Sequence, residues 1–367
     1  MMPLRVIFLY SLFILVVLNS CKLSRFVYYN TANITDYKIF PSRTANNSNE
    51  HFNFLNAKQT KVPKSIQYAN QDYPFEDFLK EQNTVAFLVI QRDSLLYEQY
   101  WDGYTDSSMI ASFSMAKSIT SILIGCAIED KLIESVEEPI TRYIPELKAN
   151  GFDDVKIKHL LQMTSGLDFR EGYINPFGEV ASFYYGTNLT KAIGKLKLKR
   201  KPGEAFEYVS GNTQLLGFVL DRALKDQSIT SYLEEKLWKP MGMEYPATWS
   251  LDRKNGIEKT FCCINARARD FAKLGRLYLN KGNWNGKQLV PVNWVKESTK
   301  AEIKEGSVPY YQYQWWLPSN NGEFIAQGIL GQFIYVNPQK DLIIVRLGKK
   351  QGKVDWWKVF SSLGQIY

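Results

Sequence analysis

A serine and a lysine stand three residues apart, at Ser114 and Lys117 in the sequence Ser-Met-Ala-Lys. On a helix, residues i and i+3 share one face, so the hydroxyl and the amine can meet one turn apart. Burial and the positive end of a helix both favour the neutral amine of a lysine. Lowering its pKa by three units costs about 4 kcal/mol, which a buried site can supply. A neutral Lys117 could then activate Ser114 as a nucleophile for acyl transfer.

The scarcity of histidine favours lysine as the base of such a site. The chain has two histidines and four cysteines, with no C-x-x-C or H-x₃-H spacing. We therefore expect no metal site and no cofactor. His51 lies in a polar, Asn-rich stretch, and His159 opens a helix-like Leu-Leu-Gln-Met run, where a capping or packing role is expected.

The pattern of apolar residues predicts an α+β fold. The pattern over Thr84 to Tyr100 predicts a β-hairpin, and that over Ser114 to Lys131 predicts a buried helix. The signals from Glu134 to Val295 are mostly helical, with Pro and Gly breaks. Strands return between Glu323 and Val345, and Asp355 to Leu363 predicts a closing helix. Strands at both ends with a helical subdomain between them predict a mostly antiparallel sheet flanked by helices.

The N-terminus has the features of an export signal. Arg5 precedes an apolar run of 13 residues, Val6 to Leu18, which is shorter than the roughly 20 that span a bilayer. The run ends Leu-Asn-Ser-Cys, which is similar to a bacterial lipobox with Cys21 as the lipidated residue. We expect an exported protein, lipid-anchored to the bacterial cell envelope and facing the periplasm or the cell surface. A plain signal peptide and an uncleaved anchor with an incidental cysteine are the alternatives.

Three segments follow from this organisation: a signal peptide and lipobox over 1–21, a tether or loosely packed lead-in over 22–71, and one catalytic domain over 72–367. The lead-in is rich in Asn, Thr, Ser and Lys. Beyond Cys21 the cysteines are Cys126, Cys262 and Cys263, and they predict no disulfide framework. Vicinal cysteines rarely pair because the ring that they close is strained.

The net charge of +8 excludes no enzyme class. The basic residues are spread along the chain, and this distribution argues against nucleic-acid binding. The densest run alternates with Leu196 and Leu198 and is typical of a solvated face; attraction to an anionic cell-wall polymer or membrane is the alternative. The aromatic tract from Tyr310 to Trp316 reads as a strand packed on the core, with an aromatic wall beside a pocket as the alternative.

The surroundings of Ser114 resemble a known family. The stretch Phe113 to Leu147 is similar to the nucleophile helix of the class C β-lactamase, DD-peptidase and esterase family. Four further blocks match in order: Ile157 to Phe169, Lys201 to Leu220, Ala268 to Val295, and Gly328 to Val345. The resemblance covers roughly residues 75 to 360. The members most similar in pattern include the aminohexanoate-dimer hydrolases and related esterases.

The resemblance implies roles for three residues. Ser114 would be the acylated nucleophile and Lys117 its general base. Tyr208, in Tyr-Val-Ser, matches the family tyrosine that relays a proton to the leaving group. Two basic neighbours would favour its tyrosinate or polarise the phenol. Ser210 stands in place of the commoner asparagine. A core tyrosine beside Phe206 is the alternative role for Tyr208.

The third motif departs from the family. Lys-Thr-Gly or His-x-Gly is usual, and this chain has Ile329-Leu330-Gly331. By the resemblance, Gly331 would let the strand approach the substrate, and the backbone N–H of Gln332 would form an oxyanion hole with that of Ser114. Ile329 cannot hold a β-lactam carboxylate, a contact worth about 1.5–3 kcal/mol. Neither Ser-Asp-Asn nor Lys-Thr-Gly occurs, so weak β-lactamase activity is expected.

The sequence therefore predicts a serine hydrolase that forms an acyl-enzyme with a small-molecule ester or amide, or with a peptide. A D,D-peptidase or β-lactamase, and a non-catalytic lipoprotein that senses cell-wall peptides, are the alternatives. The intact Ser114, Lys117 and Tyr208 favour the enzyme, and the altered third motif is the support for the sensor. The substrate itself is not set by the fold.

Overall fold

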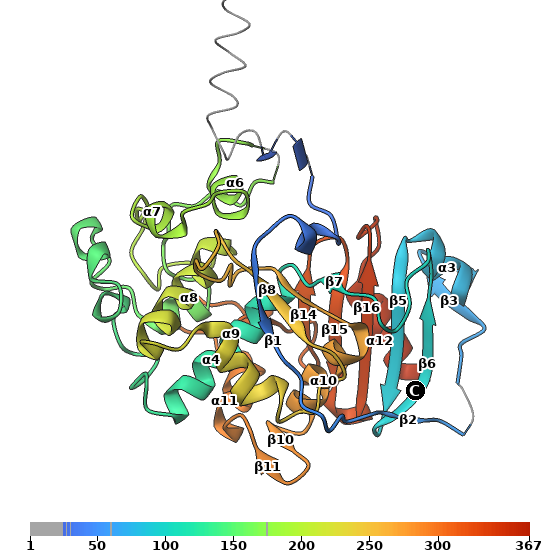
Figure 1. Ribbon diagram of the computed structural model, residues 1–367. Coiled ribbons are helices and arrows are strands. Elements are labelled where there is room, and N and C mark those ends of the chain that lie inside the picture. The colour runs from blue at the N-terminus through green and yellow to red at the C-terminus, as the bar shows by residue number, and fades with distance from the viewer. Residues whose placement is uncertain (1–24, 27, 30, 59–60, 174) are drawn as a thin grey trace, which may run out of the picture.

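A computed structural model describes residues 25–26, 28–29, 31–58, 61–173 and 175–367 (Figure 1). The predicted signal peptide and the lipobox cysteine, Cys21, lie outside the described residues. Within the described ranges, no helix is both long enough and apolar enough to cross a membrane.

The largest sheet in the described part of the chain has eight strands. Neighbouring strands pair antiparallel except at one edge, where β2 and β6 run parallel. Their order is β12 (Tyr311–Gln312), β13 (Trp315–Trp316), β14 (Phe324–Gly328), β15 (Gln332–Asn337), β16 (Leu342–Gly348), β5 (Thr84–Gln91), β6 (Ser94–Tyr100) and β2 (Leu55–Asn56).

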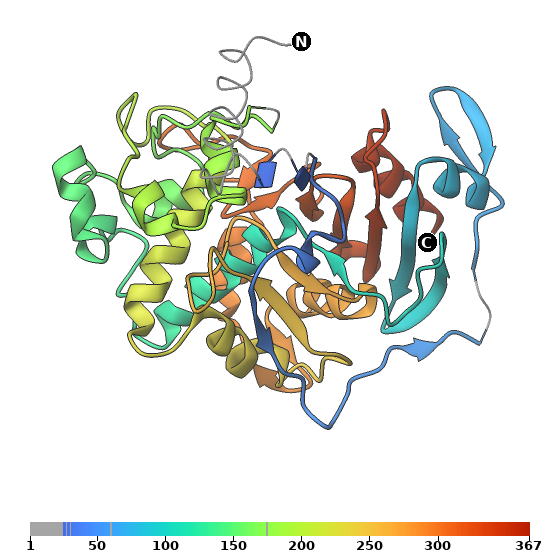
Figure 2. The same cartoon turned by 45° about the horizontal axis from the view of Figure 1, so that its top comes forward.

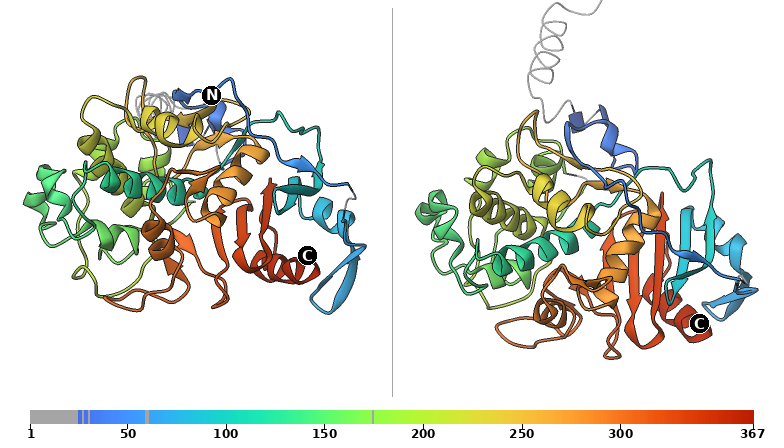
Figure 3. Two further views of the ribbon diagram at one scale, coloured as in Figure 1. Left: turned by 90° about the horizontal axis from the view of Figure 1, so that it is seen from below. Right: turned by 60° about the horizontal axis from the view of Figure 1, so that its bottom comes forward.

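Both faces of this sheet are covered, which is why β5 and β16 are apolar along nearly their whole length. Along β5, Phe87 and Val89 face a cluster built with α3 (Phe75–Glu81) and α12 (Trp356–Ile366). Ala86 and Leu88 point to the other face, toward α10 (Ala268–Leu279) and the main core. In both views of Figure 3, the red C-terminal helix lies against the red strands.

A helical region packs beside the sheet, and its central pair is α4 (Met115–Glu129) and α8 (Ser210–Leu224). Helix α4 is buried on almost every side, as its apolar sequence requires. The other helices are short: α5 (Ile157–Leu161), α6 (Glu179–Tyr184), α7 (Leu189–Ile193), α9 (Ile229–Leu233), α11 (Val292–Ser298), and the 3₁₀ or π segments η1 (Asp36–Lys38), η2 (Ile140–Arg142), η3 (Pro145–Asn150), η4 (Glu234–Trp238) and η5 (Pro338–Lys340).

A smaller, four-stranded sheet has the order β1 (Ser42–Ala45), β8 (Ala247–Ser250), β9 (Ile264–Ala266) and β7 (Ile110–Ala111). Two further hairpins lie at the periphery: β3 (Ser65–Tyr68) with β4 (Gln71–Pro74), and β10 (Asn283–Trp284) with β11 (Lys287–Gln288). The α+β class is thus confirmed, and so are the hairpin after Thr84, the buried helix after Ser114, the strands after Glu323 and the closing helix.

The lead-in differs from the tether that its composition predicts. Strand β1 pairs antiparallel with β8, and Figure 2 shows this blue segment lying beside the gold strands. Ile34, Phe40 and Ala45 are buried in the main core. A few well-spaced apolar residues are enough to bind a polar segment to a sheet edge, so compact packing begins well before residue 72.

Candidate active site

Ser114 sits at the start of α4, at the end of a tight turn. Strand β7 ends at Ala111, and Phe113 takes a left-handed backbone conformation (φ 45°) with its ring buried in the core. That turn places Ser114 at the N-cap position of α4, and Lys117 follows one helical turn later. The predicted pair therefore shares a helix face, as its spacing requires.

The amine of Lys117 joins three parts of the chain. Its Nζ lies 3.0 Å from Ser114 Oγ and 3.1 Å from Ser210 Oγ, and it donates to the Phe261 carbonyl oxygen at 2.8 Å. Only 1% of the side chain is exposed. Burial lowers the pKa of Lys117 to about 8, although the negative charge of Glu171 acts in the opposite direction. The shift corresponds to about 3 kcal/mol of preference for the neutral amine, relative to lysine in water.

Tyr208 lies beside the same amine, with its ring centre 5.3 Å from Lys117 Nζ. Burial raises the pKa of Tyr208 well above its usual value. A hydrogen bond with Ser114 lowers this pKa by a smaller amount, and the negative charge of Glu171 raises it further. The expected tyrosinate is therefore not favoured, because desolvation outweighs the stabilisation by neighbouring donors. A neutral phenol is a proton donor.

Glu171 is a member of the site that sequence reasoning missed. The Ser210 Oγ donates to one Glu171 carboxylate oxygen at 2.6 Å, and the Ser210 backbone N–H donates to the other at 2.7 Å. The hydroxyl of Tyr173 donates to the same carboxylate at 2.9 Å. A continuous chain of hydrogen bonds thus runs from Lys117 through Ser210 to Glu171. No spacing in the sequence marks this acid, since it comes from a separate loop.

The third motif approaches Ser114 through Gly328. A Cβ on Gly328, the last residue of β14, would lie 2.4 Å from the Ser112 carbonyl oxygen and 3.0 Å from the Ser114 nitrogen. Gly331 (φ 82°) instead belongs to the turn, and its own Cβ would strike the guanidinium of Arg346. Gly328 therefore makes the close approach to the backbone at Ser114, and the approach of Gly331 to a substrate stays a prediction.

Gln332, the expected second oxyanion donor, begins β15 directly after the turn. It pairs with Gly328 across the hairpin, and its side-chain amide donates to the Gly348 and Ile329 carbonyl oxygens at 2.7 Å and 3.3 Å. Ile329, in contrast, lines the same pocket as Ser114. Among the described residues, the backbone N–H groups of Ser114 and Ile329 donate no hydrogen bond. Two unused donors next to the nucleophile are what an oxyanion hole requires.

The pocket at Ser114 is narrow and mostly apolar, with about 50 Å³ of free space. Helix α6 contributes Val180, Ala181 and Tyr184 to its wall, and the lead-in contributes Phe26 and Ala32. The described residues contain no group of three or more acidic, His or Cys side chains that could hold a metal ion. The groups that the site presents are the Ser114 hydroxyl, the Lys117 amine, the Tyr208 phenol and an apolar wall.

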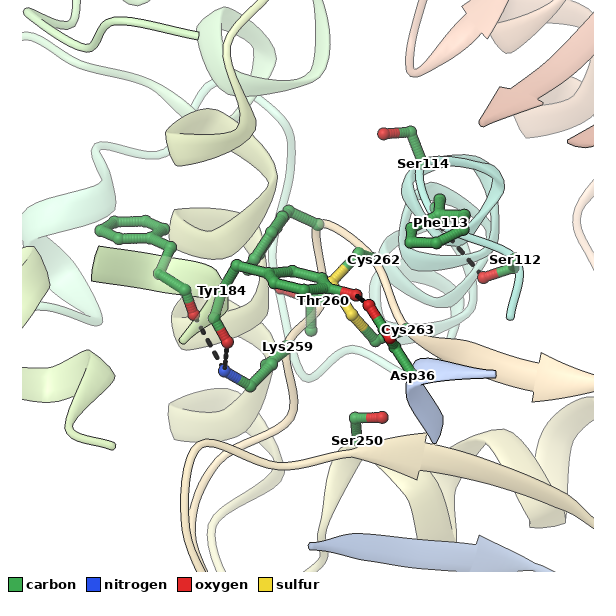
Figure 4. The surroundings of a disulfide bond; sticks show 12 residues. Asp36, Ser112, Phe113, Ser114, Tyr184, Ser250, Lys259, Thr260, Cys262 and Cys263 are labelled. Carbon is green, nitrogen blue, oxygen red and sulfur yellow. Dashed lines mark hydrogen bonds between the residues drawn. A yellow bond between two sulfur atoms is a disulfide. The ribbon is translucent and has the colours of Figure 1, made fainter. Parts of the chain in front are cut away.

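Cys262 and Cys263 form a disulfide, contrary to the sequence expectation (Figure 4). Cys263 takes a left-handed conformation (φ 76°) between the loop and β9, and both residues are almost completely buried. Spacing alone does not reveal such a local turn. The disulfide follows directly on Phe261, whose carbonyl holds Lys117, and Cys262 lines the pocket of Ser114.

Aromatic rings complete the surroundings of Tyr208. Tyr311 is buried as predicted for a core strand, but its ring and that of Trp316 also lie 5.9 Å and 5.2 Å from the ring of Tyr208. The aromatic tract therefore serves both as core and as a wall behind Tyr208. His159 is buried and accepts a hydrogen bond from the Lys156 backbone N–H at 3.1 Å, in the expected capping role.

Comparison with known proteins gives a consistent result. Residues 75–356 match the family described as Beta-lactamase. The chain is 27% identical over 297 residues to the 6-aminohexanoate-dimer hydrolase of Paenarthrobacter ureafaciens, which covers 74% of each chain.

Among solved structures, a Bacillus anthracis protein provisionally named 6-aminohexanoate-dimer hydrolase superposes with a TM-score of 0.82 at 25% identity, over 91% of this chain and 92% of that one. A family VIII carboxylesterase superposes with a TM-score of 0.60 at 17% identity, over 75% and 89% of the two chains, which supports the fold.

Proposed function

The chain belongs to the Beta-lactamase family and is a serine hydrolase, and from this premise we propose that it cleaves esters or amides through an acyl-enzyme on Ser114. One observation carries the proposal: a buried lysine amine lies 3.0 Å from the Ser114 hydroxyl, with its pKa lowered to about 8. An appreciable fraction of Lys117 is then neutral near pH 7 and can take the serine proton.

Acylation would begin when Ser114 Oγ attacks the substrate carbonyl carbon and its proton passes to Lys117 Nζ. Negative charge develops on the carbonyl oxygen. The free N–H groups of Ser114 and Ile329 are the donors that we assign to that oxygen, in place of Gln332. A single donor of this kind typically contributes a factor of 10²–10³ to the rate.

Breakdown of the tetrahedral intermediate needs a proton for the leaving group. Tyr208 is suited to give it, because its phenol is held neutral by burial and hydrogen-bonds with Ser114. Lys117, which then carries the serine proton, lies beside the Tyr208 ring and can return a proton to the phenolate. A water molecule would later attack the acyl-enzyme and release Ser114.

We propose a linear ester or amide as substrate, on the basis of the hydrolases and esterases that the chain resembles. The apolar Ile329 argues against a D,D-peptidase or β-lactamase, since no cation stands at that position for a substrate carboxylate. The intact Ser114, Lys117 and Tyr208 argue against a non-catalytic sensor. Rapid hydrolysis of a chromogenic cephalosporin by the purified protein would contradict this choice.

We also propose that the protein is exported and lipid-anchored through Cys21. The support is the sequence alone: Arg5, the short apolar run and the Leu-Asn-Ser-Cys motif. Metabolic labelling with a fatty-acid analogue, in cells that express the wild type or Cys21→Ser, tests it. Equal labelling of the two proteins would refute it.

The hydrolase assignment is tested with a short p-nitrophenyl ester. Ser114→Ala should lose almost all of the enzyme-dependent rate, because the other hydroxyl beside Lys117, that of Ser210, donates its proton to the Glu171 carboxylate. A fluorophosphonate should label the peptide that contains Ser114 in the wild type and leave the variant unlabelled, as read by mass spectrometry. Equal ester hydrolysis by the two proteins would overturn the assignment.

A further inference from the structure

Helix α6 forms one side of the Ser114 pocket. Buried residues of the helix and of its C-terminal cap line the pocket: Val180, Ala181, Tyr184 and Tyr185. The helix has only 6 residues, and helices of this length are not stable without support from the rest of the fold. The distance between this wall and the nucleophile is therefore set by the contacts that hold α6 in place.

The side chain of Lys259 holds the C-terminal end of α6. Its Nζ donates hydrogen bonds to the carbonyl oxygens of Phe183 at 2.9 Å and Tyr184 at 2.5 Å (Figure 4), and to that of Gly186 at 3.4 Å. The last carbonyl groups of a helix have no partner within the helix, and a cation is favoured beside them. Because Lys259 is fully buried, its amine serves as an internal cap for the helix.

The lead-in also holds α6, through Asp36. The Tyr184 hydroxyl donates to Asp36 Oδ2 at 2.6 Å, and both residues are buried (Figure 4). The Asn33 backbone N–H donates to the same carboxylate oxygen at 3.0 Å. The Phe40 ring lies 5.1 Å from the Tyr184 ring and 4.6 Å from the Lys259 amine, measured from its centre. Lys259 and Asp36 thus belong to one buried cluster around the helix.

The segment that carries Lys259 also carries part of the catalytic centre. The Phe261 carbonyl oxygen accepts a hydrogen bond from Lys117, and Cys262 lines the pocket. The indole N–H of Trp249, in β8, lies 3.1 Å and 3.2 Å from the Lys259 and Cys262 carbonyl oxygens and fixes the segment. Lys259 itself is not among the described residues that line the pocket. It can therefore act on a substrate only through the placement of α6.

We propose that Lys259 is a positioning residue that determines substrate specificity: together with Asp36 it keeps α6 close to Ser114, and so restricts hydrolysis to esters or amides that place a small apolar group in this pocket. This inference rests on the proposed hydrolase function. The pocket has about 50 Å³ of free space, which suits a short chain and not a branched or fused-ring group. Moving the wall would leave buried carbonyl groups without their donor, and such a loss is costly.

The test compares a small and a bulky ester in each of two pairs. 4-Nitrophenyl butanoate is compared with 4-nitrophenyl 3,3-dimethylbutanoate, which places the bulk on the acyl side. Phenyl acetate is compared with 2-naphthyl acetate, which places it on the leaving-group side. The measured quantity is the ratio of kcat/KM for the bulky ester to that for the small ester. Because each ratio is compared between enzymes, the intrinsic reactivities of the esters cancel.

In Lys259→Met, the ratio should rise about three- to ten-fold in at least one pair, within the range by which an apolar pocket discriminates one methylene group. Methionine fills the space of the lysine and donates no hydrogen bond to α6. Asp36→Leu should raise the ratio in the same pair, because the Tyr184 hydroxyl loses its acceptor. Asp36→Asn keeps an oxygen acceptor at that place and should show the wild-type ratio.

The matched control is Lys273→Met. Lys273 is also fully buried and donates to a carbonyl oxygen, that of Gly242 at 3.1 Å, but it lies on α10 and does not line the pocket. This variant should lose stability and keep the wild-type ratio in both pairs. An equal rise in Lys273→Met would show that loss of any buried lysine loosens the pocket, and would overturn the inference.

Ratios in Lys259→Met that equal those of the wild type in both pairs would also overturn the inference and leave the hydrolase assignment standing. If Lys259→Met does not fold, Asp36→Leu decides by the same ratios. Absence of any Ser114-dependent hydrolysis of all four esters would instead overturn the proposed function, and the inference with it.

Discussion

Replacing Glu171 with glutamine should move the pH dependence of catalysis to lower pH. Glu171 carries the negative charge that opposes the lowering of the Lys117 pKa by burial. Glutamine keeps an acceptor for Ser210 and removes the charge. Lys117 must be neutral to act as a base, so the rate falls as the pH drops below its pKa. Without the carboxylate, protonated Lys117 loses a stabilising partner, and the pKa must fall.

The size of the shift follows from the geometry. The two hydrogen bonds that share the Ser210 oxygen place the amine and the carboxylate no more than about 6 Å apart. At an effective dielectric constant near 20, that separation corresponds to about 3 kcal/mol, or roughly two pH units. Solvent at the half-buried Glu171 reduces it, so we expect a shift of about one unit, from near pH 8 to near pH 7.

The assay is kcat/KM for an uncharged p-nitrophenyl ester between pH 5.5 and 9.5. The acidic limb reports the pKa of the free enzyme's base. Glu179→Gln is the matched control, since it removes one negative charge at a residue that lines a different hollow and not the Ser114 pocket. Its acidic limb should stay at the wild-type position. An acidic limb of Glu171→Gln that stays near pH 8 or rises would refute the reasoning, whatever the plateau rate.

Three further substitutions test the remaining parts of the site. Tyr208→Phe should lower kcat/KM by about 10²–10⁴, the usual contribution of a general acid, while fluorophosphonate labelling continues. Gly328→Ala should reduce activity and lower the free energy of unfolding by about 1–3 kcal/mol, because the new Cβ meets backbone atoms. The loss of stability is measured as a lower melting temperature. Replacing Cys262 and Cys263 together with serine should lower kcat more than it raises KM, as the carbonyl that holds Lys117 loses its support.

Matched controls separate these effects from general damage. For Gly328, the control is Gly194→Ala, where the added Cβ makes only ordinary contacts. For the disulfide, it is Cys126→Ser, a buried cysteine without a disulfide. Wild-type kinetics for Tyr208→Phe would exclude it as the proton donor. An unchanged melting temperature for Gly328→Ala would show that the strand is farther from Ser114 than the structure places it.

The features that the sequence predicted well depend on local periodicity. The hairpin after Thr84 and the helix after Ser114 are determined by runs of apolar residues and by turn residues within one segment, so they could be read before any tertiary contact was known. The proximity of Ser114 and Lys117 is equally local, because one helical turn joins them. Tyr208 had to be carried over from a family resemblance, since 90 residues separate it from the lysine.

The features that were missed depend on contacts between distant segments. The motif Gly328-Ile329-Leu330-Gly331 contains two glycines, and only the position of the turn decides which one faces the nucleophile. Glu171 acts through Ser210, and nothing in the spacing of the two residues marks the contact. The polar composition of the lead-in concealed a strand that completes a sheet edge. Each of these three features depends on how distant chain segments pack against one another.

Under the lipidation that we propose for Cys21, the lead-in would also determine where catalysis can take place in the cell envelope. With lipid attached at Cys21, the five residues to Phe26 can extend over no more than about 18 Å, and Phe26 is part of the pocket wall. Such a protein would search a two-dimensional layer at the bilayer surface, and amphiphilic molecules that concentrate there would reach Ser114 most often. A shortened protein that begins at Asp72 would lose this restriction, and with it Phe26, Ala32 and the strand that covers β8.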